Sequence, residues 1–139
     1  MSTDRPSDAP PARLAEACTW FLIAAPPPHP EWPIDVQLVF AEAMTRLLDP
    51  EVTARAIVER CGLRDHNVYS RFKRHVGFGI KEVILLYRLR FAKKLLRDEA
   101  LTVAQIAQAV GYRSPGGFSA TFRRRWGCSP TEYRKQTEG

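Results

Sequence analysis

A repeat with a spacing of 50 residues is the feature that most restricts the fold of this chain. When the sequence is aligned with itself at that offset, aromatic, basic and glycine positions coincide. The residues Val68, Phe72, Lys73, Arg74 and Gly77 fall on Phe118, Phe122, Arg123, Arg124 and Gly127, and Ile57 falls on Ala107. Each copy contains a short helical stretch, a tight turn, a second helical stretch, a basic tail and a glycine. We therefore expect one structural unit to occur twice.

Apolar residues recur at intervals of three and four along most of the chain, which is the period of an amphipathic α-helix. The predicted helices cover 34–48, 51–60, 65–75, 80–97, 103–110 and 115–126, and a short one begins at Pro130. A plain helical bundle would explain the aromatic pairs, but not the basic residues that follow both pairs at the same offset. The sequence predicts an all-α, homeodomain-like fold in which two helix-turn-helix subdomains are joined by a long connecting helix.

Proline content separates the first 33 residues from the rest of the chain. Residues 1–33 are predicted to form a Pro-rich, largely disordered N-terminal segment, in which "ACTWFLIAA" at 17–25 is a candidate short helix. Five of the eight residues in 26–33 are proline, which favours an extended connector. Residues 34–136 are predicted to be the folded domain. The apolar run is shorter than the roughly 20 residues that a membrane-spanning helix needs.

Positive charge is concentrated in the predicted domain. The whole chain has a net charge of +6, but residues 52–136 carry eighteen basic and six acidic side chains, which is +12. Residues 1–51 carry three basic and eight acidic side chains, which is −5. Such a concentration of positive charge favours a polyanionic partner such as a nucleic acid.

Three segments make the resemblance to a known family specific. They are "RLRFAKKLL" at 88–96, "VAQIAQAVGY" at 103–112 and "FSATFRRRWGCSPTEYR" at 118–134. With this spacing of apolar, glycine and proline positions, the chain resembles the DNA-binding domain of AraC/XylS transcriptional regulators over residues 34–135. The resemblance implies two recognition helices that enter successive major-groove segments on one face of the duplex. An 18-residue connecting helix would be about 27 Å long, on the scale of the ~34 Å helical turn of DNA.

The resemblance and the helical phase together select candidate base-reading residues. They are His66, Tyr69 and Ser70 in the first unit, and Ser119 and Ala120 in the second. Members of the family often have arginine at the positions of Ser70 and Ala120, and polar residues where Gly116 and Gly117 stand. We therefore expect weak base reading by the second helix, which either begins late, near Phe118, or is soft until DNA orders it.

Basic residues beside the two recognition helices are the candidate phosphate contacts. They are Arg71, Lys73 and Arg74 in the first unit, and Arg113, Arg123, Arg124 and Arg125 in the second. About six such contacts would make the logarithm of affinity fall with the logarithm of salt concentration at a slope near −5, that is, about −0.9 per contact. Asp65 is predicted to cap its helix rather than to read a base.

The sequence contains no pattern that predicts catalysis, metal binding or a cofactor. His29, His66 and His75 lie far apart, as do the three cysteines Cys18, Cys61 and Cys128, which are expected to be buried small apolar residues. We therefore predict a non-enzymatic regulator without catalytic residues, cofactor or metal. The alternative is a protein-interaction protein whose degenerate helix-turn-helix binds DNA weakly or without specificity.

The predicted partner is double-stranded DNA, with RNA polymerase as a candidate second partner and no membrane. About 33 residues precede the predicted domain, so no small-molecule effector domain is expected. A monomer is expected because one chain already has two reading units. The resemblance favours an activator that acts in the bacterial cytoplasm, on the nucleoid.

Overall fold

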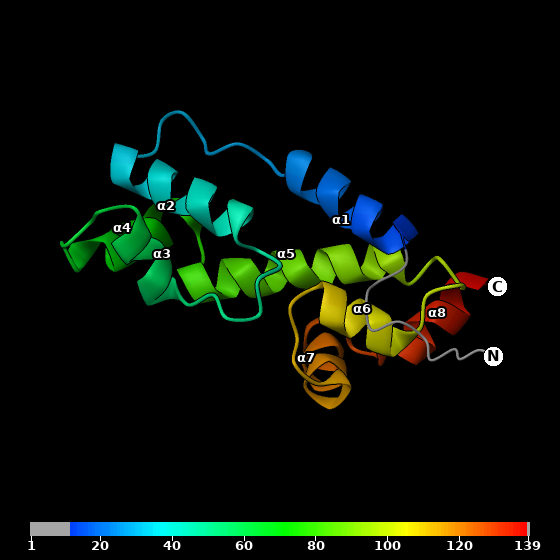
Figure 1. Cartoon of the computed structure of the whole chain (residues 1–139). Helices are drawn as coiled ribbons and strands as arrows, with labels where there is room; N and C mark the ends of the chain where they lie inside the picture. The colour runs from blue at the N-terminus through cyan, green and yellow to red at the C-terminus, as the bar shows by residue number, and fades with distance from the viewer. Residues whose placement is uncertain (1–11, 139) are drawn as a thin grey trace.

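The helical periodicity of the sequence corresponds to eight α-helices in residues 12–138, which are the residues that the computed structural model describes (Figure 1). They are α1 (Ala12–Ile23), α2 (Ile34–Thr45), α3 (Ala54–Arg60), α4 (Asn67–Val76), α5 (Ile80–Leu95), α6 (Val103–Ala109), α7 (Pro115–Trp126) and α8 (Pro130–Glu138). The predicted all-α fold with two helix-turn-helix units is confirmed. The units are α3–α4 and α6–α7, and the connecting helix is α5.

Side-chain caps set where the helices begin. The Thr102 hydroxyl accepts a hydrogen bond from the backbone N–H of Gln105 at 3.0 Å, and the Gln105 side chain accepts one from the N–H of Thr102 at 2.9 Å. This reciprocal pair is a capping box. At α7, the Ser114 hydroxyl accepts the N–H of Gly117 at 3.1 Å and Pro115 takes the first helical position. The predicted range of 115–126 is therefore right, and the alternative of a late start near Phe118 is wrong, because the cap extends the helix over both glycines.

When the two units are aligned in sequence, the number of residues that separates equivalent positions changes at the turn. Thr53 and Thr102, which lie 49 residues apart, are both N-caps of the first helix of a unit. Ile57 therefore corresponds to Ile106 and not to Ala107, as the offset of 50 suggested, and both isoleucines are buried. The second helices keep the offset of 50. The spacing from the buried isoleucine to the first buried residue of the second helix is thus one residue longer in the second unit, from Ile106 to Phe118, than in the first, from Ile57 to Val68.

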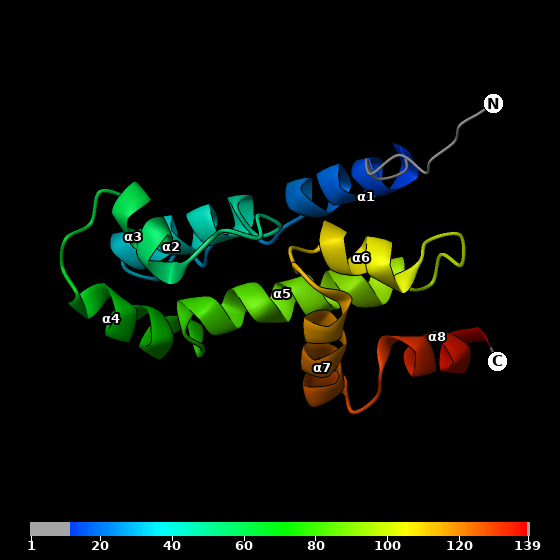
Figure 2. The ribbon, with the colours of Figure 1, turned by 60° about the horizontal axis from the view of Figure 1, so that its bottom comes forward.

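Two hydrophobic cores lie along α5 (Figure 2). The first core joins α2, α3 and α4 to the N-terminal part of α5, where Ile80, Val83 and Ile84 are buried. The second joins α6 and α7 to the C-terminal part of α5, where Leu89 and Phe91 are buried. Since one helix belongs to both cores, it carries the two units as a rod. The 16 residues of α5 make a rod about 24 Å long, slightly shorter than predicted.

Arg88 of α5 connects the end of α2 to the turn of the second unit. Its Nε donates to the carbonyl oxygen of Leu47 and its Nη2 to that of Asp49, both at 2.7 Å. Its guanidinium lies 5.9 Å from the centre of the Tyr112 ring, and burial lowers its pKa. Gly111 has a φ of 96°, and a Cβ there would lie 2.9 Å from Cζ of Arg88. Glycine is required at this turn by both the backbone and the arginine.

Arg134 of α8 repeats this arrangement at the end of α5. Its Nε donates to the carbonyl oxygen of Leu96 at 2.9 Å, and its Nη2 donates to those of Asp98 at 3.2 Å and Leu101 at 2.7 Å. Carbonyl groups at the end of a helix have no partner within the helix, so a guanidinium that reaches them stabilises the end. An arginine of the family motif thus has a structural role in each half of the molecule.

The N-terminal segment contains a helix that begins before the predicted one. The candidate helix at 17–25 corresponds to α1 (Ala12–Ile23). The connector at 26–33 has no helix, and the Gln37 side chain donates to the carbonyl oxygens of Trp32 at 2.7 Å and Pro30 at 3.2 Å. The expected disorder of residues 1–11 lies outside the described residues. Within 12–138, no helix is long and apolar enough to cross a membrane.

Candidate nucleic-acid interface

The outward face of α4 carries polar and basic side chains because its inward face belongs to the first core. Val68 and Phe72 are fully buried, as their spacing of four residues predicts. The exposed residues at the start and along the rim of the helix are His66, Asn67, Ser70, Lys73 and Arg74. This face combines groups that can hydrogen-bond base edges with groups that can bind phosphates.

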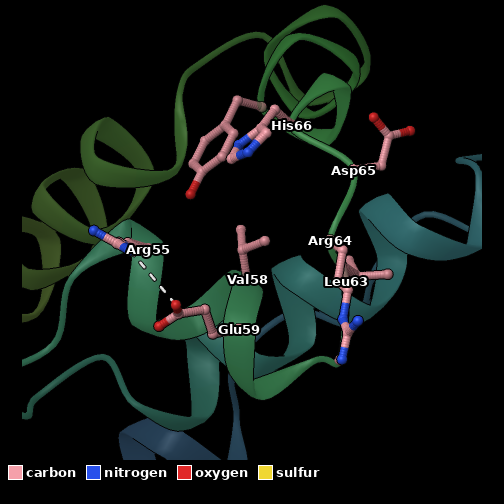
Figure 3. A pocket seen from close by; sticks show the side chains of 9 residues that line it. Arg55, Val58, Glu59, Leu63, Arg64, Asp65 and His66 are labelled. Carbon is pink, nitrogen blue, oxygen red and sulfur yellow. Dashed lines mark ion pairs between the residues drawn. The ribbon is translucent and has the colours of Figure 1, made fainter.

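Tyr69 lies at the boundary between this face and the core. Its ring is half-buried and packs against the first core. It also lines an open hollow of about 760 Å³ between α3 and α4, together with His66, Arg55 and Glu59 (Figure 3). Arg55 and Glu59 pair across one turn of α3, with 3.5 Å between Nε and Oε2. One side of the tyrosine therefore packs against the first core, and the other lines an open surface together with His66.

Arg71 is engaged by two carboxylates. Its Nη2 is 2.5 Å from Oδ2 of Asp35 on α2 and 3.1 Å from Oδ2 of Asp65. Its side chain is 27% exposed, and the hydrogen bonds to Asp35 and Asp65 raise its pKa. A phosphate would have to compete with both partners for this guanidinium. In the structure Arg71 ties α4 to α2, which sets it apart from the other predicted phosphate ligands.

Asp65 makes a capping contact at the start of α4. Its Oδ1 accepts the backbone N–H of Asn67 at 2.9 Å. This hydrogen bond is the main cause that lowers the pKa of Asp65, and the hydrogen bond from Arg71 adds to it. The carboxylate is therefore engaged in the capping role that was predicted from its position. His66, at the N-cap position itself, makes no capping bond with its side chain.

The outward face of α7 has the same frame but much smaller side chains. Phe118 and Phe122 are fully buried, as their spacing of four residues predicts. Gly116, Gly117 and Ala120 are exposed and Ser119 is half-buried. A Cβ built at Gly116 would meet nothing within 4 Å. This face therefore offers backbone N–H groups and one hydroxyl, but no long side chain in the first two turns.

The rim of α7 is strongly basic. Arg123, Arg124 and Arg125 are all exposed, and no acidic residue occurs in α7. Arg123 has one loose ion pair, with 3.7 Å between its Nη1 and Oε1 of Glu132. Arg125 lies over the ring of Trp126, with 4.7 Å from Cζ to the ring centre. These contacts leave the three guanidinium groups at the surface, where they can approach a phosphate backbone.

Arg113 lies in the turn before α7 and forms an ion pair with Glu51, which precedes α3. Both side chains are mostly exposed. The pair bridges the two halves of the molecule from the surface, so Arg113 would have to exchange a carboxylate for a phosphate on binding DNA. At exposed positions such an exchange costs little, because surface ion pairs contribute about 0–1 kcal/mol.

The predicted site residues fall into two separate surfaces, one on each unit. His66, Tyr69 and Ser70 are together on α4, and Ser119 and Ala120 are together on α7. Sequence reasoning missed Asn67, which is exposed in the first turn of α4 and is a residue type that can bind adenine in a bidentate way. Its position at the start of a second helix was the available signal. The predicted helix began at residue 65, two residues before the observed start, so Asn67 was not recognised as a first-turn residue.

A family model described as a helix-turn-helix domain matches residues 58–136, which contain α4 to α7 and most of α8. An AraC-like transcription regulator of Streptomyces lividans is 35% identical over 100 residues, which are 70% of this chain and 33% of that protein. The chain belongs to the AraC family. The AraC-type domain is a non-enzymatic DNA-binding domain. The resemblance that the sequence motifs suggested is therefore confirmed.

Two further comparisons extend this result to a second curated relative and to a solved structure. The Msm operon regulatory protein of Streptococcus mutans is 30% identical over 82 residues, which are 59% of this chain and 30% of that protein. The DNA-binding domain of AdpA, a global transcriptional factor solved in complex with a target DNA, superposes with a TM-score of 0.66 at 25% identity. That match covers 73% of this chain and 91% of the AdpA domain. The chain spans about a third of the length of the curated relatives that it matches.

Proposed function

We propose that this AraC-type protein binds double-stranded DNA in a sequence-dependent way and regulates transcription. α4 and α7 would enter adjacent major-groove segments on one face of the duplex. The observation that carries this proposal is the presence of two helix-turn-helix units on one rod, each with a buried aromatic or apolar seam behind an exposed polar and basic face. The AdpA domain, which has the same fold, was solved with its target DNA.

The first unit is proposed to read most of the sequence. His66 and Ser70 can exchange hydrogen bonds with base edges, and Tyr69 can bond a phosphate or pack on a thymine methyl group. We add Asn67 to this set. Each well-placed side chain would contribute about 1–3 kcal/mol of discrimination against a wrong base. Ser119 and Ala120 are proposed to contact the groove in the second unit, with weaker discrimination.

The basic rims are proposed to hold the DNA backbone. Arg123, Arg124 and Arg125 would bind phosphates beside α7, and Lys73 and Arg74 would do so beside α4. Arg113 would also bind a phosphate, after its guanidinium has exchanged the Glu51 carboxylate for that phosphate. Arg71 is kept as a weaker candidate because Asp35 and Asp65 already occupy its guanidinium. Phosphate contacts position the protein without reading sequence, so specificity depends on the few groove residues.

We further propose that the protein acts as an activator in the bacterial cytoplasm and that it contacts RNA polymerase. Both parts rest on the family to which the chain belongs. One curated relative, from Staphylococcus xylosus, is named as a lactose operon transcription activator and is 28% identical over 83 residues. A transcription assay with purified polymerase and a promoter that contains the selected site would test activation. A fall in transcript on addition of the protein would make it a repressor instead.

Selection of bound DNA from a random double-stranded library tests the main proposal. The expected result is one asymmetric site with two parts whose centres lie about one helical turn, or roughly 10 base pairs, apart. The part that contacts α4 should carry more sequence information than the part that contacts α7. Absence of any enriched sequence together with weak binding would overturn sequence-dependent recognition. It would favour the alternative of a protein-interaction protein with a degenerate helix-turn-helix.

A further inference from the structure

Helix α1 contacts both hydrophobic cores, although it lies outside both helix-turn-helix units. Near its beginning, Leu14 is fully buried in the second core, and Ala17 packs against the same core. At its end, Leu22 packs against the first core. Phe21 packs against both. Apart from α5, α1 is thus an element whose side chains reach the apolar interior of both halves.

The contact between α1 and α5 is centred on a pair of stacked rings. The centres of the Phe21 and Phe91 rings are 4.1 Å apart and the ring planes are inclined by 7°. Phe91 is itself almost fully buried in the second core. The Lys94 ammonium lies 5.8 Å from the centre of the Phe21 ring. Aromatic pairs contribute beyond their buried area, so this stack gives α1 a defined position on the rod.

Charged and proline residues hold the two ends of α1. At its start, Nε of Arg13 is 3.2 Å from Oδ2 of Asp98, which follows α5. At its end, the Pro-rich connector returns to α2, and the Trp32 ring packs edge-on against Phe40, with 5.2 Å between the ring centres. A connector with five prolines has little conformational freedom to lose when α1 docks. The docking of α1 against α5 therefore costs little conformational entropy.

The position of α1 keeps it away from the second recognition helix. In both ribbon views, α1 lies on one side of α5 and α7 projects from the opposite side (Figures 1 and 2). A duplex that contacts α7 from its outward face would therefore lie on the side of α5 opposite to α1.

We propose that α1 is a splint that fixes the orientation of one helix-turn-helix unit relative to the other. The proposal rests on the DNA-binding function proposed above. Two recognition helices gain from being linked only when the link holds both in register with the groove. Without the splint, bending or twisting of the molecule near the middle of α5 would spread the second unit over many orientations. Phe21 is a positioning residue in this account, since it acts on DNA through α5.

The first experiment compares Phe21→Ala with Trp20→Ala in the full chain. Trp20 is a matched control because it lies on the same helix and is 63% exposed. The probes are the selected two-part site, each part alone, and sites with one or two base pairs added between the parts. For Phe21→Ala we expect at least about a tenfold loss of affinity for the two-part site. Affinity for each part alone should stay within about twofold, because Phe21 lies on α1, outside both recognition helices.

Tolerance of the added base pairs is the result that a merely structural role would not produce. The unchanged protein and Trp20→Ala should lose affinity steeply when base pairs are added, whereas Phe21→Ala should lose proportionally less. If Phe21→Ala behaves like Trp20→Ala, or if it weakens binding to the single parts as much as to the whole site, the splint is refuted. Absence of DNA binding by the unchanged protein would instead refute the proposed function.

A second experiment needs no DNA. Spin labels are placed by Ser70→Cys and Ala120→Cys, both exposed positions on the recognition helices, after Cys18, Cys61 and Cys128 are replaced by alanine. The distribution of distances between the labels should be narrow with Trp20→Ala and clearly broader with Phe21→Ala. Should Phe21→Ala fail to fold, Phe21→Leu keeps an apolar side chain without the ring stack and should broaden the distribution less. An unchanged distribution in the folded variant would overturn the proposal.

Discussion

The two helix-turn-helix units share a backbone frame but present different surfaces. Both begin with a threonine-capped helix, and both bury two apolar or aromatic residues four positions apart in the second helix. On the outward face, α4 carries His66, Asn67 and Ser70, whereas α7 carries glycine, serine and alanine. The frame is therefore set by residues that point inward, and the surface is free to differ. In the proposed function, this difference favours sequence reading mainly by the first unit and backbone binding mainly by the second.

The attachment of the two recognition helices differs as well. Arg71 of α4 binds Asp35 of α2, so that helix is tied to its own half by a polar contact of long sequence separation. Thr121 occupies the corresponding position of α7, and its hydroxyl donates to the carbonyl oxygen of Gly117 at 2.8 Å and accepts from Nη2 of Arg124 at 3.5 Å, both within the helix. A reading helix that must place several side chains accurately benefits from such support. A helix that binds phosphates needs it less.

Truncation of the paired core phenylalanines should have the largest effect and should be similar in the two units. Phe72→Ala and Phe122→Ala are each expected to lower the free energy of unfolding by about 3–5 kcal/mol, because each leaves a cavity in a separate core. Urea unfolding measures the loss, and hydrogen exchange locates it in the altered half. A loss below about 1 kcal/mol at either position would show that the ring is not packed as described.

Removal of the α7 arginines should show most clearly that the two units contribute differently to DNA binding. Replacement of Arg123, Arg124 and Arg125 by alanine should weaken binding to all sequences and reduce the salt slope by about 2.7. Replacement of Lys73 and Arg74 should reduce it by about 1.8. Titrations at several salt concentrations measure both slopes. Unchanged affinity and slope for the triple variant would contradict the phosphate assignment.

Tyr69→Ala and its counterpart Ser119→Ala test the proposed division of reading. Tyr69→Ala should change the preferred sequence, with discrimination reduced by about 1–3 kcal/mol at one position, and should leave the salt slope nearly unchanged. Ser119→Ala should alter the preference less. Library selection with both variants provides the comparison. A larger change in preference for Ser119→Ala would reverse the proposed roles of the units.

Gly116→Ala should stabilise α7 by up to about 1 kcal/mol, because alanine is the better helix former. There is room for the methyl group, since nothing lies within 4 Å of it. Gly117→Ala is the control, because its Cβ would lie 3.1 Å from the capping Ser114 hydroxyl and should gain less. Thermal unfolding measures both variants. If α7 is soft without DNA, Gly116→Ala should also tighten binding. A loss of stability at Gly116 would contradict the described packing.

The smallest expected effect concerns the acidic cap of α4. The pKa of Asp65 is lowered in the folded state, chiefly by the N–H of Asn67 and then by Arg71. Its stabilising contribution should thus be complete above its unfolded pKa of about 3.9 and be lost as pH falls through the lower folded value. An NMR titration of the carboxyl group checks the direction. In Arg71→Ala the pKa of Asp65 should rise part of the way toward its ordinary value, because the hydrogen bond from Asn67 remains. In the unchanged protein, a pKa of Asp65 at or above the ordinary value would contradict the capping geometry.

Much of the frame could be predicted because it depends on local spacing. The capping box at Thr102, the full extent of 115–126 and the burial of Phe72 and Phe122 all follow from residues within four positions of one another. The same reasoning failed where two local signals competed. Because of the two glycines it also allowed a late start of α7 near Phe118, but the Ser114 cap and Pro115 at the first position are sufficient to begin the helix before them.

By itself the sequence determined the helical elements, the duplicated unit and the family to which the chain belongs, because helix period, caps and motif spacing are short-range properties. The tertiary structure alone decided that Arg71 meets Asp35, that Arg113 meets Glu51, and that α1 lies across both cores. These contacts join residues 36 and 62 positions apart, or whole helices. No local pattern specifies such partners, since they depend on how the packed helices bring distant faces together.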